Sequence, residues 1–329
     1  MRYRKLGRTD LNVSEISLGC SGFWGNKKFS GKNASAIVME AFERGVNFFD
    51  TGHNYSKFYA EPRLGGIVKE ILSKNDRSRL VISTKGGNAI GAWQPSFLLK
   101  SGAEKLPQNF SPDAIELSCS ESIKNLNCDY LDIFQLLMDE SEINEQLVQR
   151  LSQMKQKGMF RYLGINTHLE SDMLFISKHP EIFDMVLIDY NVLQLDREPV
   201  IDKLYQAGIG VVAGTVLAQG HLLRGKIGSL KTGSYFWYLA RTMLKSTSRR
   251  LASSSKEMRD VLASIAGMTA SQAAFSYILG NKAVASCVFG TTNITHLIDV
   301  IAATDKKLAK SDIVSIRKAY QAMPCKISE

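Results

Sequence analysis

Eight short apolar runs, separated by longer segments with helical spacing, constrain the fold of this chain more than any other feature. Short runs rich in apolar and β-branched residues are typical of strands buried on both faces of a parallel sheet. Between them, apolar residues recur at helical intervals, and Ser111 stands where the N-cap of one helix is expected. The runs begin near Val13, Val46, Leu80, Tyr130, Tyr162, Met185, Gly210 and Ala285.

This alternation favours a closed (β/α)8 TIM barrel over an open doubly wound sheet. We predict a single α/β barrel domain over residues 1–329, with an N-terminal hairpin and extended loops after strands 3 and 7. The third loop, between Gly86 and Phe110, carries Trp93, and residues 224–255 hold an extra amphipathic segment with aromatic residues. Both segments are candidate walls of a substrate pocket, although the aromatic residues could equally pack an inserted helix on the barrel.

Composition excludes several classes of protein. No run of about 18 apolar residues is present and the first ten residues are strongly charged, so we predict a cytoplasmic protein without a membrane-spanning helix. The five cysteines are scattered without a CxxC pair, which indicates neither a disulfide framework nor a metal site. The formal charge of +9 comes from basic residues interspersed with acidic ones, which favours a solvated surface over nucleic-acid binding.

In a TIM barrel, chemistry gathers at the carboxyl ends of the strands. That rule directs attention to one residue at seven of the predicted strand ends: Asp50, Lys85, Leu137, Asn166, Tyr190, Thr215 and Gly290.

Six segments, collinear over almost the whole chain, resemble the aldo-keto reductase superfamily: MRYRKLGRTDLNVSEISLGCSGFWG, FFDTGHNY, VISTKGG, RYLGIN, GIGVVAGTVLAQGHLLRGK and VFGTTNITHL. The resemblance implies a barrel that binds a nicotinamide dinucleotide, usually NADP(H), without a Rossmann domain and transfers a hydride to a carbonyl. The sequence agrees with that mode of binding, because no GxGxxG motif follows a predicted strand.

The resemblance also implies a catalytic group of Tyr55, Lys85 and Asp50. A phenol with an unperturbed pKa near ~10 donates a proton poorly until a nearby ammonium stabilises its ionised form. Lys85 would supply that charge and Asp50 would orient it, so each residue needs the others. Taken singly, the same residues could be a buried ion pair and a loop aromatic.

One position departs from the family pattern. The resemblance assigns the catalytic histidine to the end of the fourth strand, where Leu137 stands, and leucine has no hydrogen-bonding group. We expect Leu137 to face the substrate together with Trp24, His53 and Trp93.

The expected cofactor contacts, also implied by the resemblance, are partly retained. Leu187 replaces a glutamine and Gly214 replaces a stacking aromatic residue, so the nicotinamide end is altered. The turn after strand 8 retains amides that can cradle a phosphate, and the choice between NADP(H) and NAD(H) stays open. The residues expected to bind the cofactor are Asn166, Thr167, Tyr190, Thr215, Leu217, Gln219, Gly220, Gly290, Thr291 and Thr292.

Three functions agree with these residues. The first is an NAD(P)H-dependent oxidoreductase acting on a carbonyl, an imine or an activated alkene. The second is a non-redox lyase or isomerase that uses Tyr55 and Lys85 for proton transfer, and the third is a cofactor-binding regulatory protein without turnover. The catalytic group favours an enzyme acting on a small molecule. The sequence gives no basis for predicting the oligomeric state.

Overall fold

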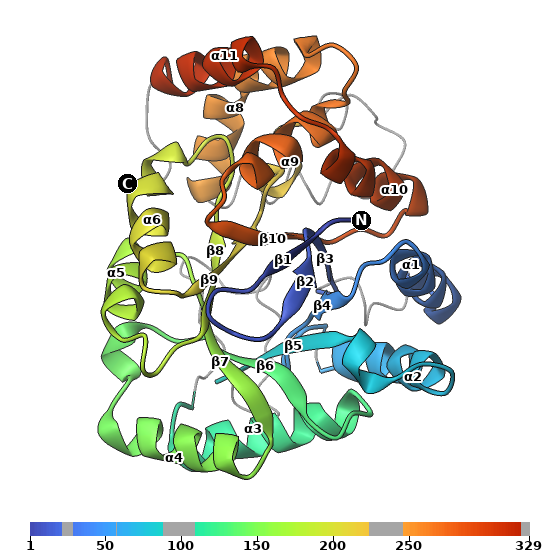
Figure 1. The fold of residues 1–329 in the computed structure, drawn as a ribbon, viewed down its shortest axis with the longest axis vertical. Coiled ribbons are helices and arrows are strands. Elements are labelled where there is room, and N and C mark those ends of the chain that lie inside the picture. The colour runs from blue at the N-terminus through green and yellow to red at the C-terminus, as the bar shows by residue number, and fades with distance from the viewer. Residues whose placement is uncertain (22–28, 57, 88–108, 224–245, 324–329) are drawn as a thin grey trace.

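The fold is taken from a computed structural model, which describes residues 1–21, 29–56, 58–87, 109–223 and 246–323 (Figure 1). Trp24, Trp93 and the aromatic run at residues 235–238 lie outside the described residues, as do most of the two predicted long loops. Their expected contacts with substrate therefore stay predictions.

Eight parallel strands close into a barrel in the order β10-β3-β4-β5-β6-β7-β8-β9 (Figure 1). Each of the eight predicted runs overlaps one of these strands, so the predicted TIM barrel is confirmed. The strands are β3 (Ile16–Gly19), β4 (Phe48–Asp50), β5 (Val81–Gly86), β6 (Leu131–Leu136), β7 (Phe160–Thr167), β8 (Met185–Asp189), β9 (Gly210–Gly214) and β10 (Val284–Phe289).

Helices surround the barrel and follow its strands in sequence (Figure 1). Ser111 caps a helix as predicted, since its side chain accepts from the Ala114 N–H at 3.4 Å. The helices are α1 (Gly31–Glu43), α2 (Ala60–Leu72), α3 (Pro112–Asn125), α4 (Glu145–Gln156), α5 (Glu170–Lys178), α6 (Glu198–Gln206), α8 (Ser246–Ser264), α9 (Ala270–Gly280), α10 (Ile294–Ile301) and α11 (Lys310–Gln321). The 3₁₀ turns are η1 (Arg77–Arg79), η2 (Glu140–Glu142), η3 (Leu195–Arg197), η4 (Ala218–Gly220) and η5 (Ala302–Asp305).

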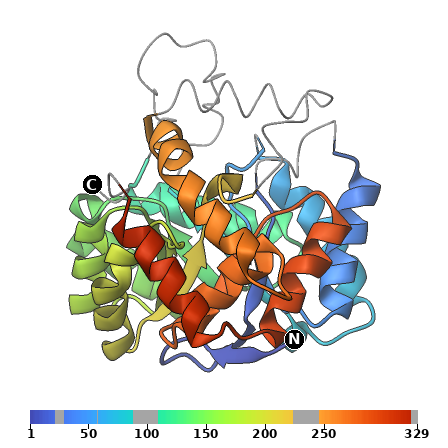
Figure 2. The same cartoon turned by 90° about the horizontal axis from the view of Figure 1, so that it is seen from above.

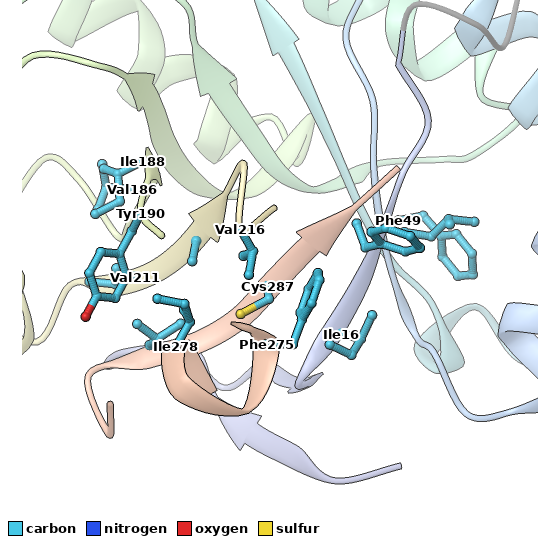
Figure 3. Packing of buried hydrophobic residues seen from close by; sticks show 14 of the residues in the cluster. Ile16, Phe49, Val186, Ile188, Tyr190, Val211, Val216, Phe275, Ile278 and Cys287 are labelled. Atoms are coloured by element: carbon cyan, nitrogen blue, oxygen red, sulfur yellow. The ribbon is translucent and has the colours of Figure 1, made fainter. Parts of the chain in front are cut away.

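Side chains alternate between two buried layers because successive residues of a strand point to opposite faces. Outward-facing residues pack against the helices; Figure 3 shows Val186, Ile188 and Val211 on this side, with Phe275 and Ile278 of α9. Inward-facing residues such as Phe48, Ile133 and Val212 fill the barrel itself. This alternation decides which residues at the strand ends face the mouth of the barrel.

The N-terminal hairpin closes the opposite end of the barrel. Strands β1 (Tyr3–Lys5) and β2 (Asn12–Ser14) pair antiparallel, as predicted, and Figure 2 shows them at one end of the molecule. Leu6, Leu11 and Val13 are buried in the same cluster as the inward-facing strand residues. The connecting turn needs glycine at position 7, since φ is +55° and a Cβ would lie 2.4 Å from the Gly210 nitrogen.

Candidate active site

Asp50 and Lys85 form an ion pair at the mouth of the barrel. Asp50 is the last residue of β4, and Lys85 lies near the end of the neighbouring strand β5. The Lys85 Nζ atom donates to Asp50 Oδ2 at 2.5 Å and to the Thr51 carbonyl at 2.7 Å. The two side chains are almost fully buried, with exposed fractions of 1% for Lys85 and 6% for Asp50. The pair is therefore held in one geometry by protein contacts rather than by solvent.

Tyr55 lies beside this pair, as the sequence predicts. It belongs to the loop after β4, and Lys85 Nζ is 5.2 Å from the centre of its ring. The ring covers Gly52, where a Cβ would stand only 3.0 Å from the ring atoms, so glycine lets the phenol lie close to the backbone. The half-buried Tyr55 and the buried pair are brought together by two adjacent strand ends.

The charge on Lys85 is stabilised by its surroundings. Burial alone would lower the pKa of its ammonium group, but the negative charge of Asp50, together with Tyr55, outweighs burial and raises the pKa above its usual value. These surroundings therefore favour the ammonium form of Lys85 next to the phenol.

Gln135 is a fourth member of the cluster that the sequence interpretation missed. It lies opposite Lys85 in the pairing of β5 with β6. Its amide nitrogen donates to Asp50 Oδ1 at 2.8 Å and to Ser83 Oγ at 2.6 Å. Both carboxylate oxygens of Asp50 thus receive a donor. The available signal was a polar residue in the inward phase of an apolar strand, two positions after Ile133.

Leu137 directly follows β6, and its N–H donates to the Gly86 carbonyl at 3.2 Å. Its half-buried side chain stands at the strand end next to that of Lys85. The assignment of the family's histidine to this position stays a prediction.

His53 does not support the expected substrate contact. Its ring is 1% exposed and is enclosed between α2 and α3, where Nδ1 lies 3.3 Å from both Glu61 Oε2 and Ser122 Oγ. Phe58 packs edge-on against the ring. Glu61 is itself fully buried and accepts from the Thr84 hydroxyl at 2.6 Å. His53 therefore belongs to a polar network behind the strands, where a substrate at the mouth does not reach it.

Three further strand ends, those of β7, β8 and β9, carry a second polar cluster. His168 follows β7, Asp189 ends β8 and Thr215 follows β9. His168 Nδ1 lies 2.8 Å from Asp189 Oδ2, and the Thr215 hydroxyl donates to Asp189 Oδ1 at 3.0 Å. The buried Arg197 donates to the carbonyls of Asp189 and His168 at 2.5 and 2.7 Å, which fixes the backbone beneath the pair.

Hydrogen bonding sets the charges of this second cluster. The bond with Asp189 raises the pKa of the His168 imidazole. Burial favours the neutral form of Asp189, but its bonds with His168 and Thr215 outweigh burial and lower the pKa of the carboxyl group. The structure therefore favours an imidazolium–carboxylate pair at this part of the mouth.

The two residues expected at the nicotinamide end, Asn166 and Thr167, make different side-chain contacts. Asn166 is half-buried, and its side-chain nitrogen donates to the Leu187 carbonyl at 3.3 Å. The Thr167 hydroxyl is occupied, because it bonds the Asp172 carboxylate and accepts the Leu169 N–H at 3.0 Å. The hydroxyl of Thr167 is therefore used to organise the start of α5.

The expected cofactor contact of Tyr190 is not supported. Its side chain is fully buried in the outer layer, close to Ile278 in Figure 3, and its hydroxyl donates to Glu198 at 3.2 Å. The reason is strand alternation: Asp189 points inward, so the next residue points outward.

The two predicted phosphate loops lie at neighbouring strand ends. After β9, the backbone is left-handed at Thr215, Ala218, Gln219 and Gly220, with φ of +50°, +47°, +58° and +94°. Such a run of unusual angles bends the chain tightly at the mouth, and Leu217 lies within it. After β10, a Cβ at Gly290 would stand 3.2 Å from the Gly19 carbonyl.

The second loop leads into the N-terminus of α10. The Thr291 hydroxyl accepts the Asn293 N–H at 3.1 Å, and Asn293 caps the helix by accepting from Thr295 at 2.8 Å. Thr292 lies between them in the same turn.

The fold is an eight-stranded parallel barrel with Lys85, Asp50 and Tyr55 gathered at the carboxyl ends of its strands, which is where barrel enzymes place their active sites. Residues 15–321 match the model of the aldo/keto reductase family, and the chain belongs to that family of oxidoreductases. The family resemblance seen in the six sequence segments is thereby confirmed.

Individual relatives are distant but extend over most of the chain. "Uncharacterized oxidoreductase YqkF" of Bacillus subtilis (strain 168) is 27% identical over 323 residues, which cover 96% of each chain. L-Galactose dehydrogenase of Arabidopsis thaliana is 28% identical over 312 residues, or 91% of this chain and 87% of that protein. Among solved structures, the holo form of aldo-keto reductase AKR11C1 from Bacillus halodurans has a TM-score of 0.74 at 23% identity, with coverage of 97% and 96%; it supports the fold alone.

Membrane-spanning helices and clusters of potential metal ligands are both absent from the described residues. No helix among them is long and apolar enough to cross a membrane. The same part of the chain holds no group of three or more histidine, cysteine, aspartate or glutamate side chains that could bind a metal ion.

Proposed function

We propose that this protein is an NAD(P)H-dependent oxidoreductase that transfers a hydride to or from a small organic substrate, with Tyr55 as the proton donor. One observation carries the proposal: the buried ion pair of Lys85 and Asp50 lies against the Tyr55 ring, with 5.2 Å from Nζ to the ring centre. Burying two charges is costly, and clusters with perturbed pKa values are typical of catalytic sites.

The residues divide the proton transfer between them. As negative charge develops on a substrate oxygen or carbon, the phenol of Tyr55 donates its proton, and the Lys85 ammonium stabilises the phenolate that remains. Asp50 and the Thr51 carbonyl accept from Nζ and keep the ammonium in place. Gln135 holds the other carboxylate oxygen, so Asp50 cannot rotate away.

The cofactor we propose is NADP(H), with NAD(H) as the alternative. When bound, a nicotinamide dinucleotide supplies the hydride. The donor set fits such a molecule: Asn166 offers an amide to the nicotinamide end, and the tight loop from Thr215 to Gly220 and the turn at Gly290 offer backbone groups to phosphates. Gly214 ends β9 without a side chain, and a Cβ there would lie 3.3 Å from the Ile188 carbonyl, so the nicotinamide ring would have no aromatic side chain to stack on at this position.

Leu137 narrows the class of substrate. A positioned general acid or electrophile typically contributes ~10²- to 10⁴-fold in rate, or about 3–5 kcal/mol of barrier. Without an imidazole at this position, an ordinary aldehyde or ketone should be a poor substrate. An apolar wall suits an imine, a carbonyl held by other groups, or a conjugated alkene whose polar end is met by Tyr55.

The first test is binding. Calorimetric titration with NADPH and NADH should give saturable binding of at least one of them. If neither binds at millimolar concentration, the redox proposal fails and a lyase or isomerase that uses Tyr55 and Lys85 takes its place. Binding without turnover of any aldehyde, ketone, imine or enone would instead favour a regulatory role.

Replacing Tyr55 by phenylalanine tests the proton donor. The ring and its packing on Gly52 are retained while the proton is removed, so turnover should fall ~10²- to 10⁴-fold with little change in cofactor affinity. Steady-state rates with the best substrate of the panel measure the effect. A Tyr55→Phe enzyme as active as the wild type would remove this residue from the mechanism.

Replacing Leu137 by histidine tests the apolar wall. A polar ring placed against an apolar substrate face is unfavourable, so the variant should gain nothing on the native substrate. Rates for simple aldehydes, compared between Leu137→His and wild type, measure this directly. Rapid reduction of simple aldehydes by the wild type would show that another group replaces the histidine.

A further inference from the structure

The second polar cluster, at the ends of β7, β8 and β9, takes no part in the proton transfer proposed above. Its three side chains are joined through one carboxylate: Asp189 receives His168 on one oxygen, at 2.8 Å, and Thr215 on the other, at 3.0 Å. Thr215 is also the first residue of the tight loop proposed for phosphates. The cluster therefore connects an imidazole to that loop through the Asp189 carboxylate.

The exposure of the cationic groups at the mouth separates His168 from the others. Lys85 is buried and bound to Asp50, and Arg197 is buried and donates to two backbone carbonyls. The His168 side chain is 67% exposed, against 24% for its partner Asp189. With Nδ1 turned to Asp189, the second ring nitrogen is directed away from the carboxylate. Of the three cations described at these strand ends, His168 alone is open to a ligand.

We propose that His168 is a cationic residue of the cofactor site, and that its imidazolium donates to a phosphate oxygen of a dinucleotide lying along the Thr215–Gly220 loop. The inference rests on the proposed function and adds a charged contact to it. Asp189 and Arg197 are positioning residues: the first fixes the ring through Nδ1, and the second fixes the backbone of both partners.

The charge balance explains why the imidazolium is needed. Asp189 places a negative charge beside the loop, and this charge alone would repel a diphosphate. The protonated His168 neutralises it and leaves one N–H for the ligand. The charged groups around the ring are Asp189 on β8, Arg197 at the end of η3 and, farther out on α5, Glu170, whose charge acts on Arg197. The bond with Asp189 raises the pKa of His168, so the cation persists toward neutral pH.

The experiment measures affinity for ADP-ribose by calorimetry between pH 6 and 9. ADP-ribose carries the diphosphate but neither a nicotinamide ring nor a 2′-phosphate that titrates in this range. A charge-assisted hydrogen bond to phosphate corresponds to roughly 10-fold in affinity. The wild type should lose about that factor as the pH rises through the raised pKa of His168, whereas His168→Gln should be weaker at pH 6 and independent of pH.

Two further variants sharpen the result. His179→Gln is the matched control, because His179 is another partly exposed histidine paired with an acid, Glu181, but at the end of α5; it should titrate like the wild type. Asp189→Asn removes the charge that raises the pKa of His168, so the loss of affinity should begin at lower pH. Circular dichroism confirms that each variant is folded.

The outcomes separate the inference from the proposed function. If the wild type binds NADPH or NADH but His168→Gln keeps the wild-type affinity and pH profile for ADP-ribose, this inference is overturned and the proposed function stands. A loss seen with NADH but absent with ADP-ribose would overturn the assignment to phosphate. If the wild type binds no dinucleotide at all, both fail.

Discussion

The two ion pairs at the mouth of the barrel are similar in distance and opposite in setting. The pair of Lys85 and Asp50, at the ends of β5 and β4, is closed off from water and surrounded by fixed donors and acceptors. The pair of His168 and Asp189, on the β7–β8 side, leaves the imidazole largely in solvent. One side of the mouth therefore holds a charge whose position is constant, and the other holds a charge that responds to pH.

The difference shows why burial, rather than distance, determines what an ion pair does. A buried pair that loses one member leaves an uncompensated charge in a low-dielectric site, whereas an exposed pair that loses one member is rehydrated. The first arrangement suits acid–base chemistry that must operate with one geometry. The second suits a contact that forms when a ligand arrives.

The largest expected effect comes from Lys85→Met. The substitution leaves Asp50 buried without its cation, which should lower the free energy of unfolding by about 3–5 kcal/mol. Urea unfolding at neutral pH measures the change. The same variant should lose turnover, since the phenolate of Tyr55 is no longer stabilised.

Lys157→Met is the control for this effect. Lys157 also forms a lysine–carboxylate contact, with Glu116 at 2.7 Å, but it is 58% exposed. Its loss should change stability by no more than about 1 kcal/mol. Equal losses in the two variants would contradict the distinction drawn between buried and exposed pairs.

A smaller effect is expected for Gln135→Leu. Leucine fills much of the volume but removes the donors to Asp50 and Ser83, and an unpaired buried acceptor costs about 1–3 kcal/mol. Thermal or urea unfolding gives the loss. Its kinetic signature should be a lower turnover number with little change in cofactor affinity, because Asp50 is free to rotate. A variant as stable as the wild type would show that Gln135 only fills space.

The smallest effect belongs to His168→Gln, which should change stability by about 0–1 kcal/mol. The pKa of His168 is raised in the folded protein, so its contribution is complete below the unfolded pKa of about 6.5 and is lost as the pH rises through the folded value. The stability difference from the wild type should thus be greatest near pH 6 and vanish toward pH 9. Urea unfolding at several pH values measures it, and a difference that grows with pH would contradict the sign.

The sequence predicts the barrel well because hydrophobic periodicity and strand order are local signals. All eight runs became strands, and Tyr55, Lys85 and Asp50 meet because adjacent strand ends are neighbours in any closed barrel. Family resemblance placed Tyr55, which lies in a loop and has no periodic signal of its own.

The errors came from the direction of side chains. Tyr190 and His53 stand near strand ends in sequence, but Tyr190 is in the outward phase of its strand and His53 is drawn between two helices by Glu61. Gln135 was missed for a different reason. The strand pattern places its side chain inward, but its partners lie on other strands. Nearby residues in the sequence show whether a residue lies at a strand end. The partner that orients its side chain lies on another strand or helix, so the local pattern does not reveal it.

The hairpin beneath the barrel has a kinetic consequence. Leu6, Leu11 and Val13 stop the lower end, and the interior above them is filled with side chains. Among the described residues, the mouth of the barrel is therefore the end through which a molecule would reach and leave Lys85. Two ligands that share one entrance block each other's path. The more deeply bound ligand must therefore bind first and dissociate last. The architecture thus favours a compulsory order of binding, which product-inhibition patterns would reveal.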